Sequence, residues 1–279
     1  MSHICFNGKI VPASDPIILA SNRGYRYGDG LFETIKLQKG QLLLKDYHFD
    51  RLFSGFSLLK FNVPSRFTRE RLEDEILHLC RKNECETLAR VRLSVSRGNG
   101  GLYDDDRSLQ YLIECWPLNE TVNNLNENGL VIDVYTGAEK SCDPFANLKT
   151  ANFLIYSMAA IHAKENKLND CLVLNTNGSI ADSTTANLFL VKKDNILTPE
   201  PGEGCVEGVM RRWLLEHLRE TGYKINETTI TVNDIKQGDE VFLTNAIHGI
   251  RWVKQFRDKT FRNDMTMKIY DQFVKTIHV

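Results

Sequence analysis

The sequence predicts an α+β protein of two domains, and three observations lead to that prediction. The chain has 279 residues, which is long for one hydrophobic core and sufficient for two. Segments with the alternating pattern of strands and segments with helical spacing are mixed along both halves. A polar, asparagine-rich stretch, Asn119–Gly129, separates the halves. We therefore expect a smaller N-terminal α/β domain at 1–118, a linker at 119–129 and a larger C-terminal domain of mixed sheet and helix at 130–279.

The N-terminal half contains strands, then helices, then a pair of strands. "HICFNGKIV" and "GLFETIKLQKGQLLLK" have extended patterns, with "QKGQ" as a hairpin turn. "KDYHFDRLFSGFSLLKF" has helical spacing with Asp46 as its expected cap, and an amphipathic helix is expected from Ser65. "TLARVRLSVSRG" and "LQYLIECWPL" alternate like paired strands. These elements fit one sheet covered by helices.

The C-terminal half mixes the two kinds of element around a core of its own. It opens on the strand "LVIDVYTG" and on a helix expected from Ala151, in which apolar residues recur at helical spacing. Strands follow in "DCLVLNTNG", "NLFLVKKDNILTP" and "EVFLTNAI", with a helix in "GVMRRWLLEHLRETG" before the last of them. The chain closes with a helix expected at about 265–277.

Composition and charge argue against several classes of protein. The chain carries 35 basic and 36 acidic side chains, so it has no basic field to attract nucleic acid. Its N-terminus lacks a signal pattern and no apolar run approaches the length of a membrane span, so we expect a cytoplasmic protein with no membrane partner. Its seven cysteines lack CxxC spacing and are expected as buried, reduced thiols, with no metal site.

Lys149 stands just before the apolar helix, in "NLKTAN". One explanation is an ordinary helix N-terminal lysine whose amine reaches water. The other is a partly buried amine whose reactivity suits Schiff-base chemistry. No carboxylate lies three or four residues away to form a routine helical ion pair, which favours the second explanation slightly.

Three further positions offer functional groups, and each of them alone is only weak evidence for a site. Asp182 begins "DSTTANLFLV". Its side chain either bonds the local backbone in a turn or accepts a hydrogen bond from a cationic ring nitrogen. Gly208 begins a helix whose free N–H groups can bind an anion. Arg51 lies on a helix, where a surface position is the usual explanation. Together with Lys149 they are the groups that a phosphate-bearing aldehyde cofactor needs.

The chain resembles the class IV, or fold-type IV, pyridoxal-phosphate enzymes. That family holds branched-chain aminotransferases, D-amino-acid aminotransferases and aminodeoxychorismate lyases. The likeness runs from "NRGYRYGDGLFETIKLQKGQLLLKDYHFDRL" through "NLKTANFL", "DSTTANLFLV", "EGVMRRWLLE" and "VFLTNAI", in the family's order and over nearly the whole chain. The resemblance implies the fold-type IV architecture of two domains, pyridoxal 5'-phosphate as cofactor, and a homodimer.

The resemblance also assigns roles to residues of this chain. Lys149 matches the lysine that forms the aldimine with pyridoxal phosphate and moves the substrate's Cα proton. Asp182 stands where the family usually has a glutamate that contacts the pyridine nitrogen, so its side chain is one methylene shorter. The residues that match phosphate-binding positions are Arg51, Val209, Met210 and Ala246.

The sequence is less informative about which reaction of the family this chain performs. Phe32 replaces the tyrosine, and Leu102 and Asp104 replace the arginine and histidine, of the carboxylate trap found in D-amino-acid aminotransferases. "FET" matches the branched-chain "FEG" only in part, and "SRGNGG" resembles the lyases. Handedness and side-chain preference of the substrate are therefore left open.

Two arginines are candidates for binding the substrate carboxylate, because a guanidinium can grip a carboxylate with two hydrogen bonds. Arg26 lies in "GYRYGDG", and Arg97 ends a strand beside a glycine-rich turn. His248 and Phe32 are further candidates for lining the substrate site. A surface-loop, turn or packing role is the alternative for these positions.

We predict a transaminase that moves an amino group between an amino acid, possibly a D-amino acid, and a 2-oxo acid. The alternative within the family is an aminodeoxychorismate lyase that releases pyruvate and 4-aminobenzoate. An inactive relative that serves in binding or assembly is a third possibility, and the change at Asp182 is its only support.

Overall fold

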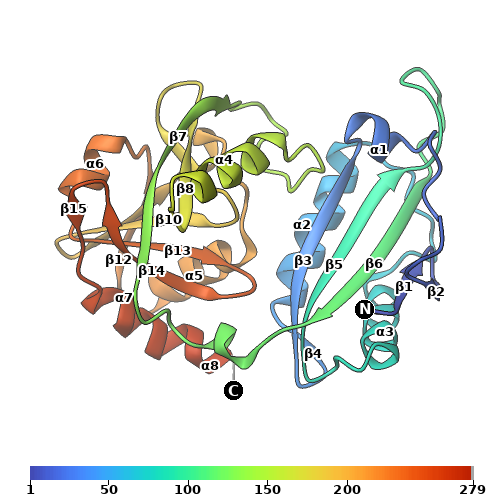
Figure 1. The fold of residues 1–279 in the computed structure, drawn as a ribbon, viewed down its shortest axis with the longest axis horizontal. Coiled ribbons are helices and arrows are strands. Elements are labelled where there is room, and N and C mark those ends of the chain that lie inside the picture. The colour runs from blue at the N-terminus through green and yellow to red at the C-terminus, as the bar shows by residue number, and fades with distance from the viewer. Residues whose placement is uncertain (278–279) are drawn as a thin grey trace. The chain divides into compact units, whose positions relative to one another are not determined.

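The computed structural model describes residues 1–277 and divides into two compact units (Figure 1). Unit 1 comprises Met1–Glu120 together with Leu148–Asn152. Unit 2 comprises Thr121–Asn147 and the chain from Phe153 onward. The mixture of helix and strand in both units confirms the predicted α+β class.

The unit boundaries differ from the predicted domains in two places. Most of the stretch expected as a linker belongs to unit 2, because Leu125 packs against the core of that unit and Asn126 bonds the backbone of Trp252. The segment that contains Lys149 was expected in the C-terminal domain but belongs to unit 1. Both differences arise from contacts between residues far apart in the sequence.

Unit 1 is a six-stranded sheet in the order β2-β1-β6-β5-β3-β4, within the part of the chain that the structure describes. All of its paired strands are antiparallel. The expected hairpin joins β3 to β4 through Lys39 and Gly40, both with positive φ, as a two-residue turn requires. The elements of the unit are β1 His3–Phe6, β2 Lys9–Pro12, α1 Arg23–Tyr27, β3 Gly30–Gln38, β4 Gln41–Leu42, α2 Lys45–Leu58, α3 Arg69–Lys82, β5 Leu88–Arg97 and β6 Leu109–Pro117.

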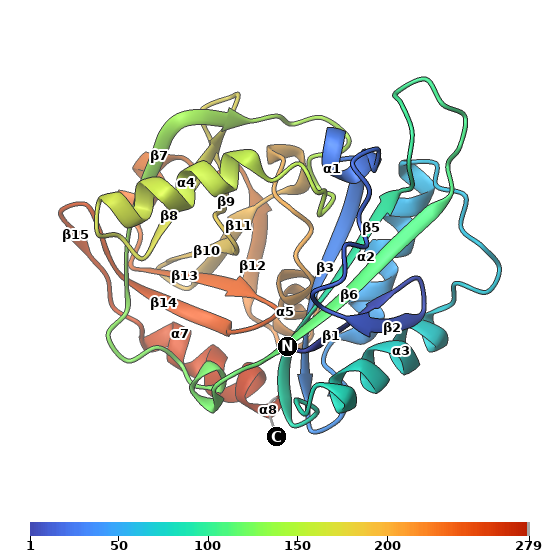
Figure 2. The same cartoon turned by 45° about the vertical axis from the view of Figure 1, so that its right-hand side comes forward.

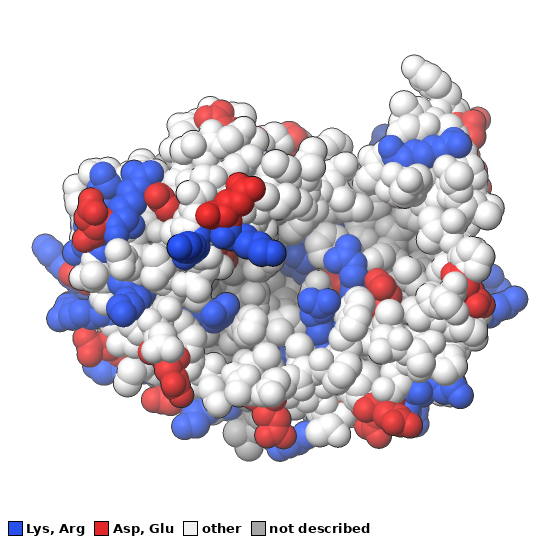
Figure 3. Space-filling view, in the orientation of Figure 1, with Lys and Arg blue, Asp and Glu red and all other residues white. Residues whose placement is uncertain are grey.

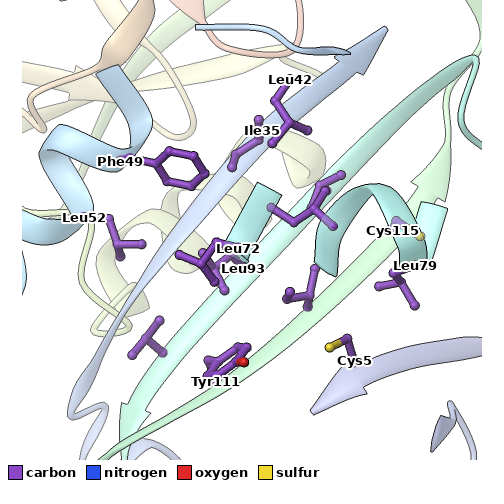
Figure 4. Packing of buried hydrophobic residues seen from close by; sticks show 14 of the residues in the cluster. Cys5, Ile35, Leu42, Phe49, Leu52, Leu72, Leu79, Leu93, Tyr111 and Cys115 are labelled. Atoms are coloured by element: carbon purple, nitrogen blue, oxygen red, sulfur yellow. The ribbon is translucent and has the colours of Figure 1, made fainter. Parts of the chain in front are cut away.

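One face of this sheet packs against α2 and α3. Because side chains alternate along a strand, Ile35 of β3 and Leu93 of β5 point to the same side, where they meet Phe49 of α2 and Leu72 of α3 (Figure 4). Each large side chain buried in this way contributes about 1.5–3 kcal/mol. The opposite face carries the alternate residues, among them Phe32 and Arg92.

Unit 2 contains a mixed sheet in the order β12-β11-β10-β13-β14-β7-β8-β9, with β15 paired to β14. The β11–β12, β14–β7 and β7–β8 pairs are parallel and the other pairs are antiparallel. The strands are β7 Leu130–Lys140, β8 Asp170–Asn175, β9 Ile180–Ser183, β10 Asn187–Lys192, β11 Asn195–Pro199, β12 Lys224–Thr228, β13 Glu240–Asn245, β14 Gly249–Phe256 and β15 Lys259–Thr260. The helical segments are η1 Glu120–Asn123 (whose first residue, Glu120, belongs to unit 1), α4 Leu154–Glu165, η2 Pro201–Glu203, α5 Val209–Glu220, α6 Val232–Gln237, α7 Asp264–Ile269, the π-helical η3 Tyr270–Val274 and α8 Lys275–Ile277.

Several helix boundaries differ from the predicted ones. The N-cap of α2 is Leu44 in a left-handed conformation, and Asp46 lies in the first turn instead. Helix α3 begins at Arg69, because Thr68 rather than Ser65 accepts the capping hydrogen bond, from the N–H of Arg71. The predicted C-terminal helix is three consecutive pieces, α7, η3 and α8.

Helix α4 (Figure 2) begins at Leu154 rather than at Ala151. Several of its apolar side chains are exposed. Leu154 is 74% exposed, Met158 43% and Ile161 49%. The residues of α4 that pack inward are the small or tyrosine side chains Tyr156, Ala159 and Ala163. The apolar spacing that predicted the helix therefore marks its exposed face.

Charge is distributed as the composition suggested. Basic and acidic side chains are interspersed over the face shown in Figure 3. Within the described residues, no helix is both long enough and apolar enough to cross a bilayer.

Candidate active site

Lys149 is fixed against the edge of β3 by backbone contacts. The N–H of Phe32 donates to the carbonyl of Lys149, at 2.9 Å. Thr150 forms an isolated bridge with Leu31, and the N–H of Ala151 donates to the carbonyl of Gly30 at 2.9 Å. The lysine is thus an extended residue added to a sheet of unit 1, and it lies five residues before the helix that it was expected to open.

The amine of Lys149 and the guanidinium of Arg92 each lie close to the buried ring of Phe32. Its Nζ is 4.6 Å from the centroid of the Phe32 ring, and the guanidinium carbon of Arg92 is 3.9 Å from the same centroid. Burial lowers the pKa of Arg92, while the neighbouring carboxylate of Glu114 opposes that effect. Nε of Arg92 donates to the hydroxyl of Ser94 at 3.0 Å. The sequence analysis missed Arg92, although it alternates with buried residues along β5.

A buried carboxylate, Glu33, holds Arg51 and His48 on the helix-facing side of β3. Nε of Arg51 donates to Oε1 at 2.8 Å, and Nη2 donates to Oε2 at 2.5 Å. Nδ1 of His48 lies 2.6 Å from Oε2. Glu33 takes up two of the five N–H groups of the Arg51 guanidinium and so fixes its orientation.

Electrostatics assign protonation states to this cluster. Burial by itself raises the pKa of Glu33, but Arg51 and His48 outweigh it and lower the pKa to about 2. Burial lowers the pKa of His48 and Glu33 opposes that effect, while the charges of Arg51 and Lys149 add to the lowering. His48 is therefore neutral at pH 7 and donates from Nδ1 to Glu33. Among the described residues, its buried Nε2 has no hydrogen-bond partner.

The cluster predicts a loss of stability in acid. Unfolded histidine takes up a proton below its ordinary pKa of 6.5, and unfolded glutamate below 4.5, whereas folded His48 and Glu33 resist protonation until lower pH. The free energy of unfolding should therefore fall as the pH drops below 6.5, and Glu33 alone should account for about 3 kcal/mol by pH 2. Urea unfolding at a series of pH values measures this. In Glu33→Gln the decline below pH 4.5 should be shallower, and an unchanged slope would contradict the assignment.

Asp182 of β9 is a buried carboxylate of unit 2, and four groups donate to it. Its Oδ2 accepts from the hydroxyl of Tyr156 at 2.8 Å, from Nζ of Lys140 at 3.1 Å and from the N–H of Val206 at 2.9 Å. Its Oδ1 accepts from Nδ2 of Asn187 at 2.9 Å. A carboxylate offers about four acceptor positions, so a further donor must share with or displace one of these groups.

The start of α5 lies next to this carboxylate through Val206 and Asn187. Its N-cap is Gly208, which has no side chain to cap the helix, so Val209 and Met210 begin a helix of 12 residues with no side-chain cap. Such a helix start attracts anions, because its first N–H groups point outward and carry the positive end of the helix dipole.

Gly208 is required by packing. A Cβ at this position would lie 1.8 Å from Oδ1 of Asn187, the residue that donates to Asp182. We expect Gly208→Ala to displace Asn187 and to reduce the free energy of unfolding by about 1–3 kcal/mol. Gly202→Ala is the matched control, because its nearest neighbour there is 4.0 Å away. Equal losses in the two variants, measured by urea unfolding, would show that the Asn187 contact is not responsible.

The structure places the remaining candidate residues as follows. Ala246 and His248 lie in the turn after β13, where Oδ1 of Asn245 accepts from the N–H of His248 at 2.9 Å. Arg26 is exposed in α1 and donates to the carbonyl of Ala20. Arg97 bonds a carboxylate and a carbonyl within unit 1 and lies over an aromatic ring; these partners are Asp29, Leu59 and Phe61.

Within unit 1, then, the structure groups Lys149 with Phe32 and Arg92, and it groups Arg51 with Glu33. Within unit 2 it groups Asp182 with the start of α5. A buried acceptor, cationic donors, an uncapped helix start and an amine beside an aromatic ring match the chemistry of a phosphorylated pyridine aldehyde.

Comparison with known proteins identifies the family of the chain. Residues 30–256 match the model of the amino-transferase class IV family. A protein of Methanocaldococcus jannaschii named provisionally as a branched-chain-amino-acid aminotransferase is 27% identical over 97% of this chain and 94% of its own. A D-alanine aminotransferase of Listeria monocytogenes is 23% identical over 87% of this chain and 83% of its own. The crystal structure of 4-amino-4-deoxychorismate lyase from Pseudomonas aeruginosa has a TM-score of 0.86 and 25% identity, over 99% of this chain and 100% of that one. The chain therefore belongs to the class IV aminotransferases, a family of pyridoxal-phosphate enzymes.

Proposed function

We propose that this protein is a transaminase that moves an amino group from an amino acid to a 2-oxo acid, with Lys149 as its catalytic residue. The observation that supports this most directly is the fixed backbone of Lys149 beside Phe32 and Arg92. Because the backbone of Lys149 is held at the edge of a strand, its Cα stays in place while the amine bonds first to one group and then to another. Pyridoxal phosphate, when bound, supplies an aldehyde that exchanges with amines and a ring that withdraws electrons from the substrate Cα.

The residues that would hold the phosphate have the chemistry it requires. The guanidinium of Arg51 and the first N–H groups of α5, at Val209 and Met210, are donors suited to a phosphate dianion. Ala246 is proposed to add a backbone contact from the turn after β13. Glu33 would orient Arg51 for this role, since it fixes one edge of the guanidinium with two hydrogen bonds.

Two side chains would manage protons. The amine of Lys149 would take the proton from the substrate Cα and would hold it for its return during the same transfer. Asp182 would accept a hydrogen bond from the ring nitrogen, which keeps that nitrogen protonated. Because Lys140, Tyr156, Val206 and Asn187 already donate to Asp182, the ring nitrogen would share the carboxylate with these four donors.

Arg92 is our first candidate for binding the substrate carboxylate. It shares the Phe32 ring with the Lys149 amine, so a carboxylate bound there would lie near the reacting carbon. Arg26, Arg97 and His248 are retained as proposals for the same function. Arg97 ranks below Arg92 because its guanidinium binds Asp29 and a backbone carbonyl.

Replacement of Arg92 by alanine should raise the KM for the amino acid by about 10- to 100-fold, which corresponds to the loss of one or two hydrogen bonds to a charged group. Arg97→Ala is the control, and we expect it to lower stability and to change KM much less, since its partners lie within unit 1. Steady-state kinetics and thermal unfolding on both variants separate the two roles. A larger KM effect in Arg97→Ala would reverse the ranking.

The reaction class is tested with purified enzyme loaded with pyridoxal phosphate. Panels of D- and L-amino acids are mixed with it, and conversion of the cofactor to its pyridoxamine form is followed by absorbance. Conversion by at least one amino acid, reversed by a 2-oxo acid such as 2-oxoglutarate, is the expected result. Release of 4-aminobenzoate and pyruvate from aminodeoxychorismate without an oxo acid would establish the lyase instead, and no reaction at all would support an inactive binding protein.

We also propose a cytoplasmic homodimer. The exposed apolar stripe of Leu154, Met158 and Ile161 on α4 is large for a helix face in water and suits burial against a second copy. Light scattering after size-exclusion chromatography tests this, and a monomer at micromolar concentration would contradict it.

A further inference from the structure

A group of three cysteines in unit 1 lies apart from the residues considered above. Cys80 is in the last turn of α3, Cys85 follows that helix, and Cys115 is on β6, where Figure 4 shows it beside the helix that covers the sheet. Their three Sγ atoms all lie within 4.8 Å of one another, and all three residues are buried. We propose that this trio is a binding site for one thiophilic d10 metal ion, such as Cu⁺, Zn²⁺ or Cd²⁺, held by three sulfurs.

The spacing of the sulfurs suits a shared metal. A Zn–S bond of about 2.3 Å places the sulfurs of a three- or four-coordinate site about 3.8–4.0 Å apart. The Sγ atoms of Cys85 and Cys115 are 3.5 Å apart, and the Sγ atom of Cys80 lies within 4.8 Å of both. Shifts of a few tenths of an ångström in each sulfur position would therefore complete the site. A disulfide would use only two of the three sulfurs, whereas a metal accounts for the convergence of all three.

The surroundings prepare one of these sulfurs as an anion. Nδ2 of Asn83 donates to Sγ of Cys115 at 3.2 Å, and the thiol of Cys85 donates to the same atom. Thiolate is the form that binds metal, and two hydrogen-bond donors directed at the Cys115 sulfur favour that form.

The other two sulfurs enter as thiols and lose their protons on binding. Because the metal binds thiolates, the thiol protons pass to the solvent as the three metal–sulfur bonds form. Affinity should therefore increase with pH. Cys85, exposed by 4%, is the least buried of the three and marks the side from which the ion enters.

The backbone around the trio is restrained in a way that keeps the sulfurs together. The N–H of Cys85 donates to the carbonyl of Cys80 at 3.0 Å, which closes the turn after α3. Oδ1 of Asn83 accepts from the N–H groups of Ser2 and His3, so the turn is also tied to the first strand. The three ligands come from segments with fixed positions, which limits the reorganisation that binding costs.

The test uses the reduced full-length protein and Cd²⁺ alone as the probe, with the ultraviolet sulfur-to-cadmium absorption as the readout. One equivalent should saturate the band, and affinity should rise between pH 6 and pH 8. Cys80→Ser and Cys115→Ser should each weaken Cd²⁺ binding by at least about tenfold. The loss of a residue that only hydrogen-bonds a metal ligand already lowers metal affinity by about that factor. Cys171→Ser is the control, since it removes a buried cysteine of unit 2, and it should retain the band.

A second measurement needs no variant and so does not depend on how the serine variants fold. Cd²⁺ should protect Cys80, Cys85 and Cys115 from slow alkylation, located by peptide mass spectrometry, and should leave Cys171 and Cys205 unprotected. No band at one equivalent, or equal protection of all buried cysteines, would overturn the proposal. The readouts do not involve amine transfer, so the outcome is independent of the proposed function.

Discussion

Replacement of Lys149 by alanine is expected to reduce amine transfer by at least about 10³-fold and to leave the fold intact. The chemical loss follows from the roles proposed for its amine, since a positioned acid or base alone contributes about 10²–10⁴-fold. The fold should survive because the contacts that fix this segment are made by the backbone: Phe32 donates to the carbonyl of Lys149, and Ala151 donates to Gly30. The change in the free energy of unfolding should stay within about 0.5 kcal/mol.

Single-turnover conversion of a loaded enzyme by its best amino acid measures this loss. Lys164→Ala, at an exposed position of α4, is the control and should keep wild-type activity. Borohydride reduction of the wild-type enzyme with pyridoxal phosphate, followed by peptide mapping, should attach the cofactor to Lys149. A tag on Lys36 or Lys140, both of them buried lysines, would assign the reactive amine elsewhere.

The sequence was sufficient to predict the fold class and to single out Lys149 as a candidate, because both depend on local patterns. Strand alternation and helical spacing are set by neighbouring residues, and the "NLKTAN" motif is continuous in sequence. The partners of Arg51 could not be predicted in the same way. Its contact with Glu33 depends on the register between α2 and β3, which only the folded chain establishes.

Arg92 and helix α4 illustrate two different reasons for a missed feature. Arg90 and Arg92 alternate with buried residues along β5, and that pattern is also typical of a solvent-exposed strand face. Arg92 lies close to Phe32 because β3 pairs with β5, and the sequence alone did not establish that pairing. In α4 the helical period was read correctly, but the spacing could not show that the apolar stripe is exposed, because hydrophobic spacing does not distinguish a core-facing stripe from an exposed one.

Replacement of Asp182 by asparagine should lower both stability and activity, for separable reasons. The amide cannot pair with the ammonium of Lys140, whose side chain is 9% exposed, so a buried charge loses its partner. Such losses cost about 3–5 kcal/mol. Activity should fall by about 10²-fold or more, since a neutral amide does not keep the ring nitrogen protonated. Urea unfolding and the loaded enzyme's half-reaction measure the two effects.

Asp182→Glu tests whether the shorter carboxylate impairs this enzyme. The added methylene must enter a carboxylate position already bonded by Tyr156, Asn187 and the backbone of Val206, so we expect a stability loss of about 1–3 kcal/mol and lower activity. A large gain in activity would instead show that the natural site is weakened by its aspartate.

The double variant Asp182→Asn, Lys140→Met separates the structural role of the carboxylate from its chemical role. Removal of both members of a buried ion pair is often nearly neutral, because no charge is left unpaired. We therefore expect the double variant to regain most of the stability that Asp182→Asn loses, while its activity remains low. If activity returned together with stability, Asp182 would act only by neutralising Lys140, and the proton on the ring nitrogen would have to be held by another group.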